Sequence, residues 1–122
     1  RDKWPYAIEP LYKSHQKFGF IEPLITFAPS VGISQIIEVD KNFFKNQAHR
    51  GFVFGTMGFA ATEFIPSLSL FFISTDRKNK IISTNQLVLE ERIRDLIYHP
   101  QNNVAIYSSD SNGVIGILVP IP

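Results

Sequence analysis

The sequence predicts an all-β protein built from antiparallel strands, and three observations lead to this prediction. Phenylalanine accounts for 11 of the 122 residues, and many of these rings stand in short runs with β-branched residues, as is typical of sheets. Turn sequences rich in Pro, Gly, Asn and Asp interrupt these runs at short intervals. Residues 63–75 also alternate with period two. Strands this short, joined by turns this often, indicate antiparallel pairing.

The chain begins with a lead-in, residues 1–23, that three prolines make irregular. Residues 24–27 are apolar and are expected to form a short strand, which Pro29 and Gly32 then turn or bulge.

Two strands are expected next, at residues 33–40 and 51–57, because both runs are rich in Ile, Val and Phe. The polar segment 41–51 between them contains Phe43 and Phe44, and we expect it to be a loop that tucks an aromatic ring inward.

The middle of the chain predicts a hairpin. In residues 63–75, Leu68, Leu70 and Phe72 alternate with Ser67, Ser69 and Phe71. The polar residues 76–80 are a turn, and residues 80–90 are the returning strand.

The last third repeats this pattern. Strands are expected at residues 92–99, 104–109 and 114–120, with turns at 100–103 and 110–113, the second of which ends in a glycine. One alternative is a helix over residues 85–97, with Asn85 as its N-cap and Glu90 and Arg94 as an i,i+4 pair.

Composition excludes several classes of protein. The formal net charge is +1 and no basic run is interleaved with aromatics, so a dedicated nucleic-acid surface is not expected. Cysteine is absent, which removes disulfides, thiol catalysis and zinc–thiolate sites. No window approaches the roughly 18 apolar residues of a membrane span, and we expect no membrane partner. The first ten residues do not form a signal peptide.

Two arginines stand at the start of an apolar run, Arg92 and Arg94 in "ERIRDLIYH". Residues two apart point to the same face of a strand. Both guanidinium groups therefore face either water, paired with Glu90, Glu91 or Asp95 as most surface ion pairs are, or a bound anion.

Several motifs resemble, in order, the C-terminal third of the soluble quinoprotein sugar dehydrogenases, the glucose/sorbosone dehydrogenase family. They are "WP" at residues 4–5, "EPLITFAPSVGISQIIEV", "RGFVFGTM" and "ERIRDLIYHPQNNVAIYSSDSNGVIGIL". The resemblance covers nearly the whole chain, and "RIRD" with its turn and "YSSD" is the most specific part. It implies a six-bladed β-propeller that holds pyrroloquinoline quinone (PQQ) and oxidises an aldose at C1, with calcium supporting the cofactor. A periplasmic or secreted location is also implied.

The resemblance places five residues of this chain near the cofactor. Arg92 and Arg94 fall on two family arginines that contact PQQ, a tricarboxylate that suits planar guanidinium groups. Ser30, Gly32 and Met57 fall on positions whose main chain lies near it.

The sequence also departs from the family. A lysine usually follows the element matched by "FVFGTM", and here that position is Gly58. The family's histidine base and calcium loop lie in earlier blades, and His15, His49 and His99 match neither. No catalytic residue and no metal ligand is therefore assigned in this chain, and the chain alone is expected to be inactive.

These observations predict one domain, residues 1–122, with one blade at 24–89 and most of the last blade at 90–122. A pair of blades exposes two apolar flanks. We therefore expect self-association, or coverage by the missing blades. Other arrangements stay open: a β-sandwich that dimerises, or a non-catalytic scaffold or interaction module derived from a propeller.

Overall fold

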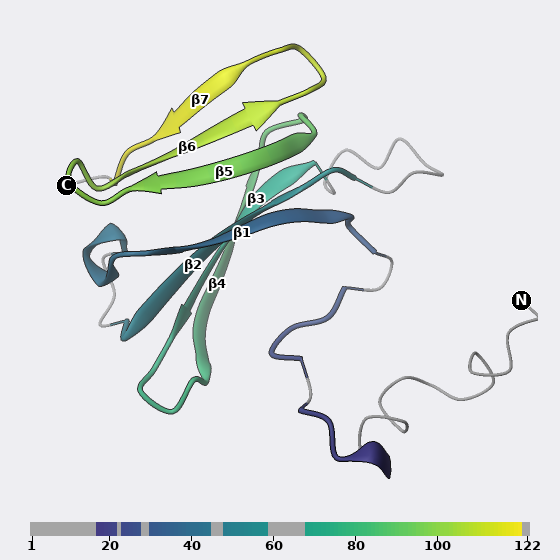
Figure 1. Ribbon diagram of the computed structural model, residues 1–122, viewed down its shortest axis with the longest axis vertical. Helices are drawn as coiled ribbons and strands as arrows, with labels where there is room; N and C mark the ends of the chain where they lie inside the picture. Colours follow the sequence, from purple (N-terminus) through teal and green to yellow (C-terminus); the bar gives the residue numbers. More distant parts are fainter. Residues whose placement is uncertain (1–16, 22, 28–29, 45–47, 59–67, 121–122) are drawn as a thin grey trace, which may run out of the picture.

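Seven strands form two antiparallel sheets in the computed structural model, which describes residues 17–21, 23–27, 30–44, 48–58 and 68–120 (Figure 1). The four-stranded sheet has the order β1-β2-β3-β4 and the three-stranded sheet the order β5-β6-β7. The strands are β1 (Ile33–Val39), β2 (Arg50–Thr56), β3 (Ser69–Thr75), β4 (Ile81–Val88), β5 (Ile93–His99), β6 (Val104–Ser109) and β7 (Ile115–Leu118). The predicted all-β antiparallel class is confirmed.

Each strand expected between residues 33 and 120 corresponds to one of these strands, with ends that differ by a few residues. Residues 63–67 of the expected 63–75 strand, and the lead-in up to residue 16, lie outside the described residues. Between β1 and β2 the short 3₁₀ turn η2 (Lys41–Phe43) follows Asp40, whose Oδ1 accepts a hydrogen bond from Asn42 N at 2.8 Å.

One expectation was wrong, and the alternative helix is excluded. Residues 24–27 form no strand; Pro23 at their start has no N–H to donate to a ladder, and Ile25 and Phe27 instead pack against the four-stranded sheet. The helix over residues 85–97 is also absent, because residues 81–88 are β4 and 93–99 are β5. Between them Glu90 has φ +60°, a left-handed conformation that no α-helix contains.

The main core lies between the two sheets. Val39, Val53 and Leu70 from the four-stranded sheet meet Ile93 and Leu96 of β5, and all five are at most 4% exposed. Phe43 and Phe44 pack against this core, which confirms that the segment after β1 turns its aromatic rings inward.

A second cluster lies on the other face of the four-stranded sheet. Phe54, Phe71 and Ile73 are buried there under Ile25 and Phe27, and the Phe54 and Phe71 rings stack with centroids 5.1 Å apart. Both faces of β2 and β3 are therefore covered. Along β3 the period-two pattern separates two apolar environments rather than core from solvent.

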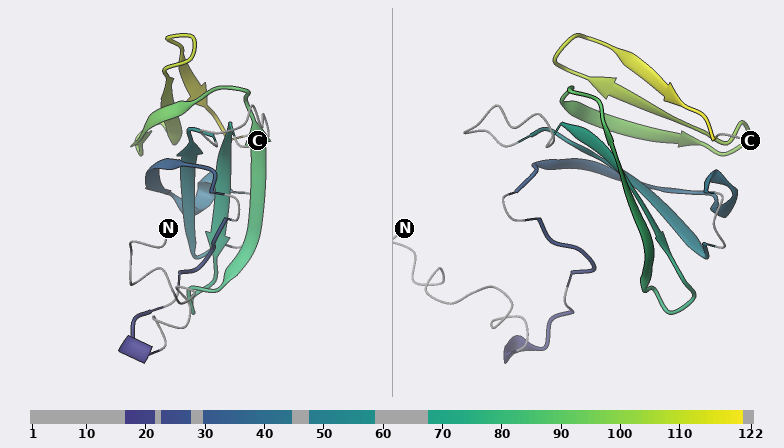
Figure 2. Two further views of the ribbon diagram at one scale, coloured as in Figure 1. Left: turned by 90° about the vertical axis from the view of Figure 1, so that its right-hand side faces the viewer. Right: turned by 180° about the vertical axis from the view of Figure 1, so that it is seen from behind.

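The two sheets approach each other through their first strands. β5 lies against β1 and β2, and the sheets diverge from there toward β4 and β7 (Figures 1 and 2). Gly55 of β2 permits this approach, because a Cβ at that position would collide with the Ile93 side chain. The chain crosses from one sheet to the other between Val88 and Ile93. The described strands do not close into a ring.

Candidate functional site

Arg92 and Arg94 flank the most deeply buried residue at the start of β5. Ile93 is 0% exposed, whereas both arginine side chains are about half exposed, at 50% and 56%. A register shift between Ile93 and Asp95 leaves Arg94 as the extra residue of a bulge in the β5–β6 pair. Ile93 is thus anchored in the core, and the two guanidinium groups lie on the opposite, solvent side.

Both arginines share one carboxylate, that of Asp110. Arg92 Nε lies 3.7 Å from Oδ1 and Arg94 Nε lies 3.5 Å from Oδ2. These distances exceed the roughly 2.7–2.9 Å of a close charge-assisted hydrogen bond. The expected ion-pair partners were Glu90, Glu91 or Asp95, and the structure gives Asp110 in their place. The two guanidinium groups therefore share a single carboxylate, and neither has a close ion pair of its own.

The turn between β6 and β7 fixes Asp110 in this position. Asp110 N donates to Arg92 O at 3.2 Å, and Arg92 N donates to Ser111 Oγ at 3.0 Å. Ser109 N closes the turn on Val114 O at 2.9 Å. Two residues of the turn, Asp110 and Ser111, therefore hold the main chain of Arg92 immediately before β5.

Met57 joins the arginines to the other sheet. Arg94 Nη1 donates to Met57 Sδ at 3.2 Å, and Met57 N donates to Gly32 O at 2.8 Å. Gly32 N in turn donates to Ser30 Oγ at 3.3 Å. The five residues predicted to lie near a cofactor are therefore brought into one neighbourhood at the ends of β1, β2 and β5, with Ser30 linked only through Gly32.

Two glycines set the backbone of this neighbourhood. Gly32 and Gly58 both have positive φ, +62° and +84°, and Gly58 N donates to Val31 O at 3.1 Å. A Cβ on Gly32 would lie 2.8 Å from Gly58 O. Among the described residues, the cations that the structure places beside these glycines and Met57 are Arg92 and Arg94.

The opposite end of the sheets has a different ionic arrangement. Arg50 donates to both carboxylate oxygens of Glu38, from Nε at 2.8 Å and from Nη2 at 3.0 Å. This bond lowers the pKa of Glu38 and raises the pKa of Arg50. A hollow of about 460 Å³ lies beside the pair, with Lys41, His49 and Tyr98 among its lining residues. Each charge of the Glu38–Arg50 pair is already matched, so the Arg50 guanidinium is not available to another anion.

The described histidines lie away from the arginines. His49 is exposed, and its main-chain N–H donates to Thr75 O at 2.8 Å. His99 ends β5 at the far end from Arg94. His15 lies outside the described residues. Among the residues that the structure describes, no group of three His, Asp or Glu side chains could hold a metal ion.

Sequence reasoning missed Asp110 and Ser111 as members of the site. The signal was present in the turn at residues 100–103. A hairpin folded there pairs Tyr98 with Ala105 and Ile97 with Ile106, and extending that register brings residues 110–111 beside Arg92. Glu90, Glu91 and Asp95 were expected as partners because they are close to the arginines in sequence. Asp110 becomes a neighbour only through the β5–β6 register.

Comparison of the chain with protein-family models, curated proteins and solved structures finds no match. Within the described residues, no helix is long and apolar enough to cross a membrane.

Proposed function

We propose that this chain is the C-terminal portion of a PQQ-dependent sugar dehydrogenase-like protein, and that Arg92 and Arg94 hold the cofactor's carboxylates. The observation that carries the proposal is the meeting of Arg92, Arg94, Met57 and Gly32 at one end of the sheets. The motif resemblance had selected these residues from three separate parts of the chain.

The arrangement of the sheets supports the same proposal. In a β-propeller each blade is a meander of up to four antiparallel strands, and the first strands of neighbouring blades lie closest together. Here both sheets are meanders, and β1 and β5 lie together while the outer strands diverge. The chain is then two blades of a six-bladed ring, which the missing blades complete.

The residues present fit part of such a cofactor. PQQ carries three carboxylates, and two exposed guanidinium groups at the start of β5 can each bind a carboxylate through paired N–H donors. Asp110 competes for the same donors and must give way to the ligand. When bound in the family, PQQ accepts the hydride from C1 of an aldose. In this chain Arg92 and Arg94 bind and orient the anion, and Met57 packs beside Arg94.

The described part of the chain offers no histidine base at this site, because His49 and His99 lie at the other end of the sheets. The chain alone is then expected to bind PQQ without oxidising aldoses. The base and the calcium ion belong to blades outside this chain. The aldose partner and a periplasmic or secreted location are proposed on the resemblance alone.

Titration with PQQ tests the proposal. The unmodified chain should show a saturable change in PQQ absorbance, and Arg92→Gln and Arg94→Gln should each weaken binding, with the double variant showing none. Arg50→Gln is the matched control, because it removes an exposed strand arginine at the other end. Equal binding by all of these variants would refute the site. Aldose-dependent dye reduction by the isolated chain with PQQ and calcium would refute the inference that the catalytic base lies outside this chain.

The second candidate is a non-catalytic scaffold or interaction module. It is favoured by Asp110, which already neutralises part of the arginine charge, and by Gly58 in place of a lysine. Absence of any absorbance or thermal shift with PQQ supports this candidate. Binding of a simple aromatic tricarboxylate as strongly as PQQ would identify a general anion site instead.

A further inference from the structure

The outer face of the three-stranded sheet carries isoleucine side chains from all three strands. Two cross-strand rows cover it: Ile97, Ile106 and Ile117 form one row, and Asp95, Ser108 and Ile115 form the other. Ile97, Ile115 and Ile117 are 56%, 76% and 63% exposed. We call Ile97, Ile106, Ile115 and Ile117 the isoleucine face. Contiguous apolar surfaces of this kind on a soluble protein usually mark an interface.

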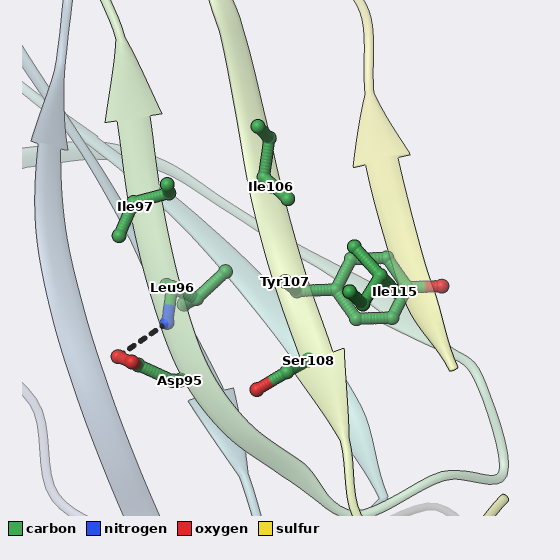
Figure 3. Close-up of a pocket in the computed structure, with 7 residues that line it drawn as sticks. All are labelled: Asp95, Leu96, Ile97, Ile106, Tyr107, Ser108 and Ile115. Atoms are coloured by element: carbon green, nitrogen blue, oxygen red, sulfur yellow. Dashed lines mark hydrogen bonds between the residues drawn. The ribbon is translucent and has the colours of Figure 1, made fainter. Parts of the chain in front are cut away.

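A hollow lies on this face at Ser108. It has a volume of about 150 Å³ and lies among Asp95, Ile97, Ile106 and Ile115, with Leu96 and Tyr107 also contributing (Figure 3). The small Ser108 side chain stands between the larger neighbours on β5 and β7. The face thus offers both a recess and projecting isoleucines, so it can interdigitate with another apolar sheet face.

The four-stranded sheet differs on its own outer face, because Ile25 and Phe27 already cover its centre. In a head-to-tail ring of copies, the isoleucine face of one copy would meet the outer face of the four-stranded sheet of the next copy. That contact would displace Ile25 and Phe27. A two-fold arrangement, in which the isoleucine face meets the same face of a second copy, displaces nothing.

The polar ends of β5 fit a two-fold arrangement. Asp95, Ile97 and His99 occupy alternate positions of the strand and are all exposed, so an acceptor and an ionisable donor stand on either side of the central isoleucine. We consider a two-fold axis that lies in the interface between the three-stranded sheets of two copies and runs perpendicular to their strands. Such an axis places β5 of one copy opposite β5 of the other, with the two strands antiparallel. Asp95 then meets the partner's His99, and this pairing occurs twice.

We propose that the isoleucine face is a two-fold interface between copies of this chain, centred near Ile97. The proposal concerns copies of the 122-residue chain and can fail without the PQQ site failing, because Arg92 and Arg94 lie outside the face. It competes with ring closure, because the next blade of a closed ring would occupy the same face. If the natural occupant of the isoleucine face is a propeller blade or an unrelated protein, the chain alone should not self-associate.

Sedimentation and light scattering of the 122-residue chain test this proposal. The expected result is a concentration-dependent dimer. Ile97→Lys and Ile117→Lys should reduce the apparent mass to half while the circular dichroism spectrum stays unchanged. Ile82→Lys is the matched control, since Ile82 is a 48% exposed isoleucine of the four-stranded sheet, and it should remain dimeric.

A charge exchange provides a second measurement that does not depend on an isoleucine. Asp95→Lys and His99→Asp should each weaken the dimer, and the double variant should recover at least tenfold of the lost affinity. A monomeric unmodified chain, or a dimer unaffected by Ile97→Lys and Ile117→Lys, would overturn the proposal. Failure of the double variant to recover affinity would overturn the antiparallel arrangement of β5.

Discussion

The two ends of the stacked sheets carry arginines in contrasting surroundings. At one end Arg50 is held by both oxygens of its own carboxylate, Glu38, at 2.8 and 3.0 Å. At the other end Arg92 and Arg94 share Asp110 at 3.7 and 3.5 Å. All three side chains are similarly exposed, from 43% to 56%. The contrast therefore lies in the ratio of charges and in the contact geometry.

This contrast shows how a structural ion pair differs from a candidate anion site. A bidentate pair uses the planar fork of the guanidinium fully and leaves little attraction for another anion. Two guanidinium groups around one distant carboxylate leave donors and charge available. Arg92 and Arg94 are also fixed by a buried residue, Ile93, and by a hydrogen-bonded turn, so their convergence requires little further ordering when a ligand binds.

The largest effect is expected from Ile93→Ala, which removes the anchor between the two arginines. Truncating a fully buried isoleucine should lower the free energy of unfolding by about 2–5 kcal/mol, as measured by urea denaturation. PQQ binding should weaken as well, although both guanidinium groups remain. Ile82→Ala, at a 48% exposed position, should cost far less. A small effect at Ile93 would mean that the sheets do not pack as described.

A smaller loss of stability is expected from Gly32→Ala. Its φ of +62° should cost about 1–2 kcal/mol with any Cβ, and the contact with Gly58 O at 2.8 Å adds to this. Gly113→Ala is the control, because Gly113 has φ +64° and open space around it. Equal losses in the two variants, measured by thermal denaturation, would show that the close approach beside Met57 is unimportant.

Asp110→Asn should change binding rather than stability. Removing the shared carboxylate should strengthen binding of PQQ about two- to fivefold, the range expected for one exposed charge, in a calorimetric titration. Glu38→Gln at the other end should have no effect on this affinity. Weaker binding by Asp110→Asn would instead mean that Asp110 organises the arginines for the ligand.

The smallest effect concerns the pH dependence of the Glu38–Arg50 end. The hydrogen bond from Arg50 holds the pKa of Glu38 below its ordinary value of 4.5. A lowered folded-state pKa stabilises the fold above pH 4.5, and this contribution is lost as the pH falls through the lowered pKa. In Glu38→Gln the melting temperature should therefore fall slightly less steeply as the pH is lowered below 4.5, as measured by thermal denaturation. An unchanged pH dependence would show that the pair contributes nothing to stability.

Much of the local structure was predictable from the sequence, because strands and turns depend on neighbouring residues. The turns at 76–80, 100–103 and 110–113 identified the β3–β4, β5–β6 and β6–β7 hairpins, and Phe43 and Phe44 indicated an inward loop. Residues 24–27 were assigned to a strand because they are apolar, yet they serve as a cover for Phe54 and Phe71. Apolar character alone does not distinguish a strand from an irregular segment lying on one.

The sequence by itself determined where the chain extends and turns, since period and turn chemistry are local properties. The bulge at Arg94 interrupts the period, so the side on which Arg92 and Arg94 lie was settled by the structure. Tertiary structure alone decided that Asp110 lies between them, that Met57 reaches Arg94 from the other sheet, and that one outer face is covered while the other is bare. These contacts depend on register and sheet packing, which join residues distant in sequence and leave no local pattern.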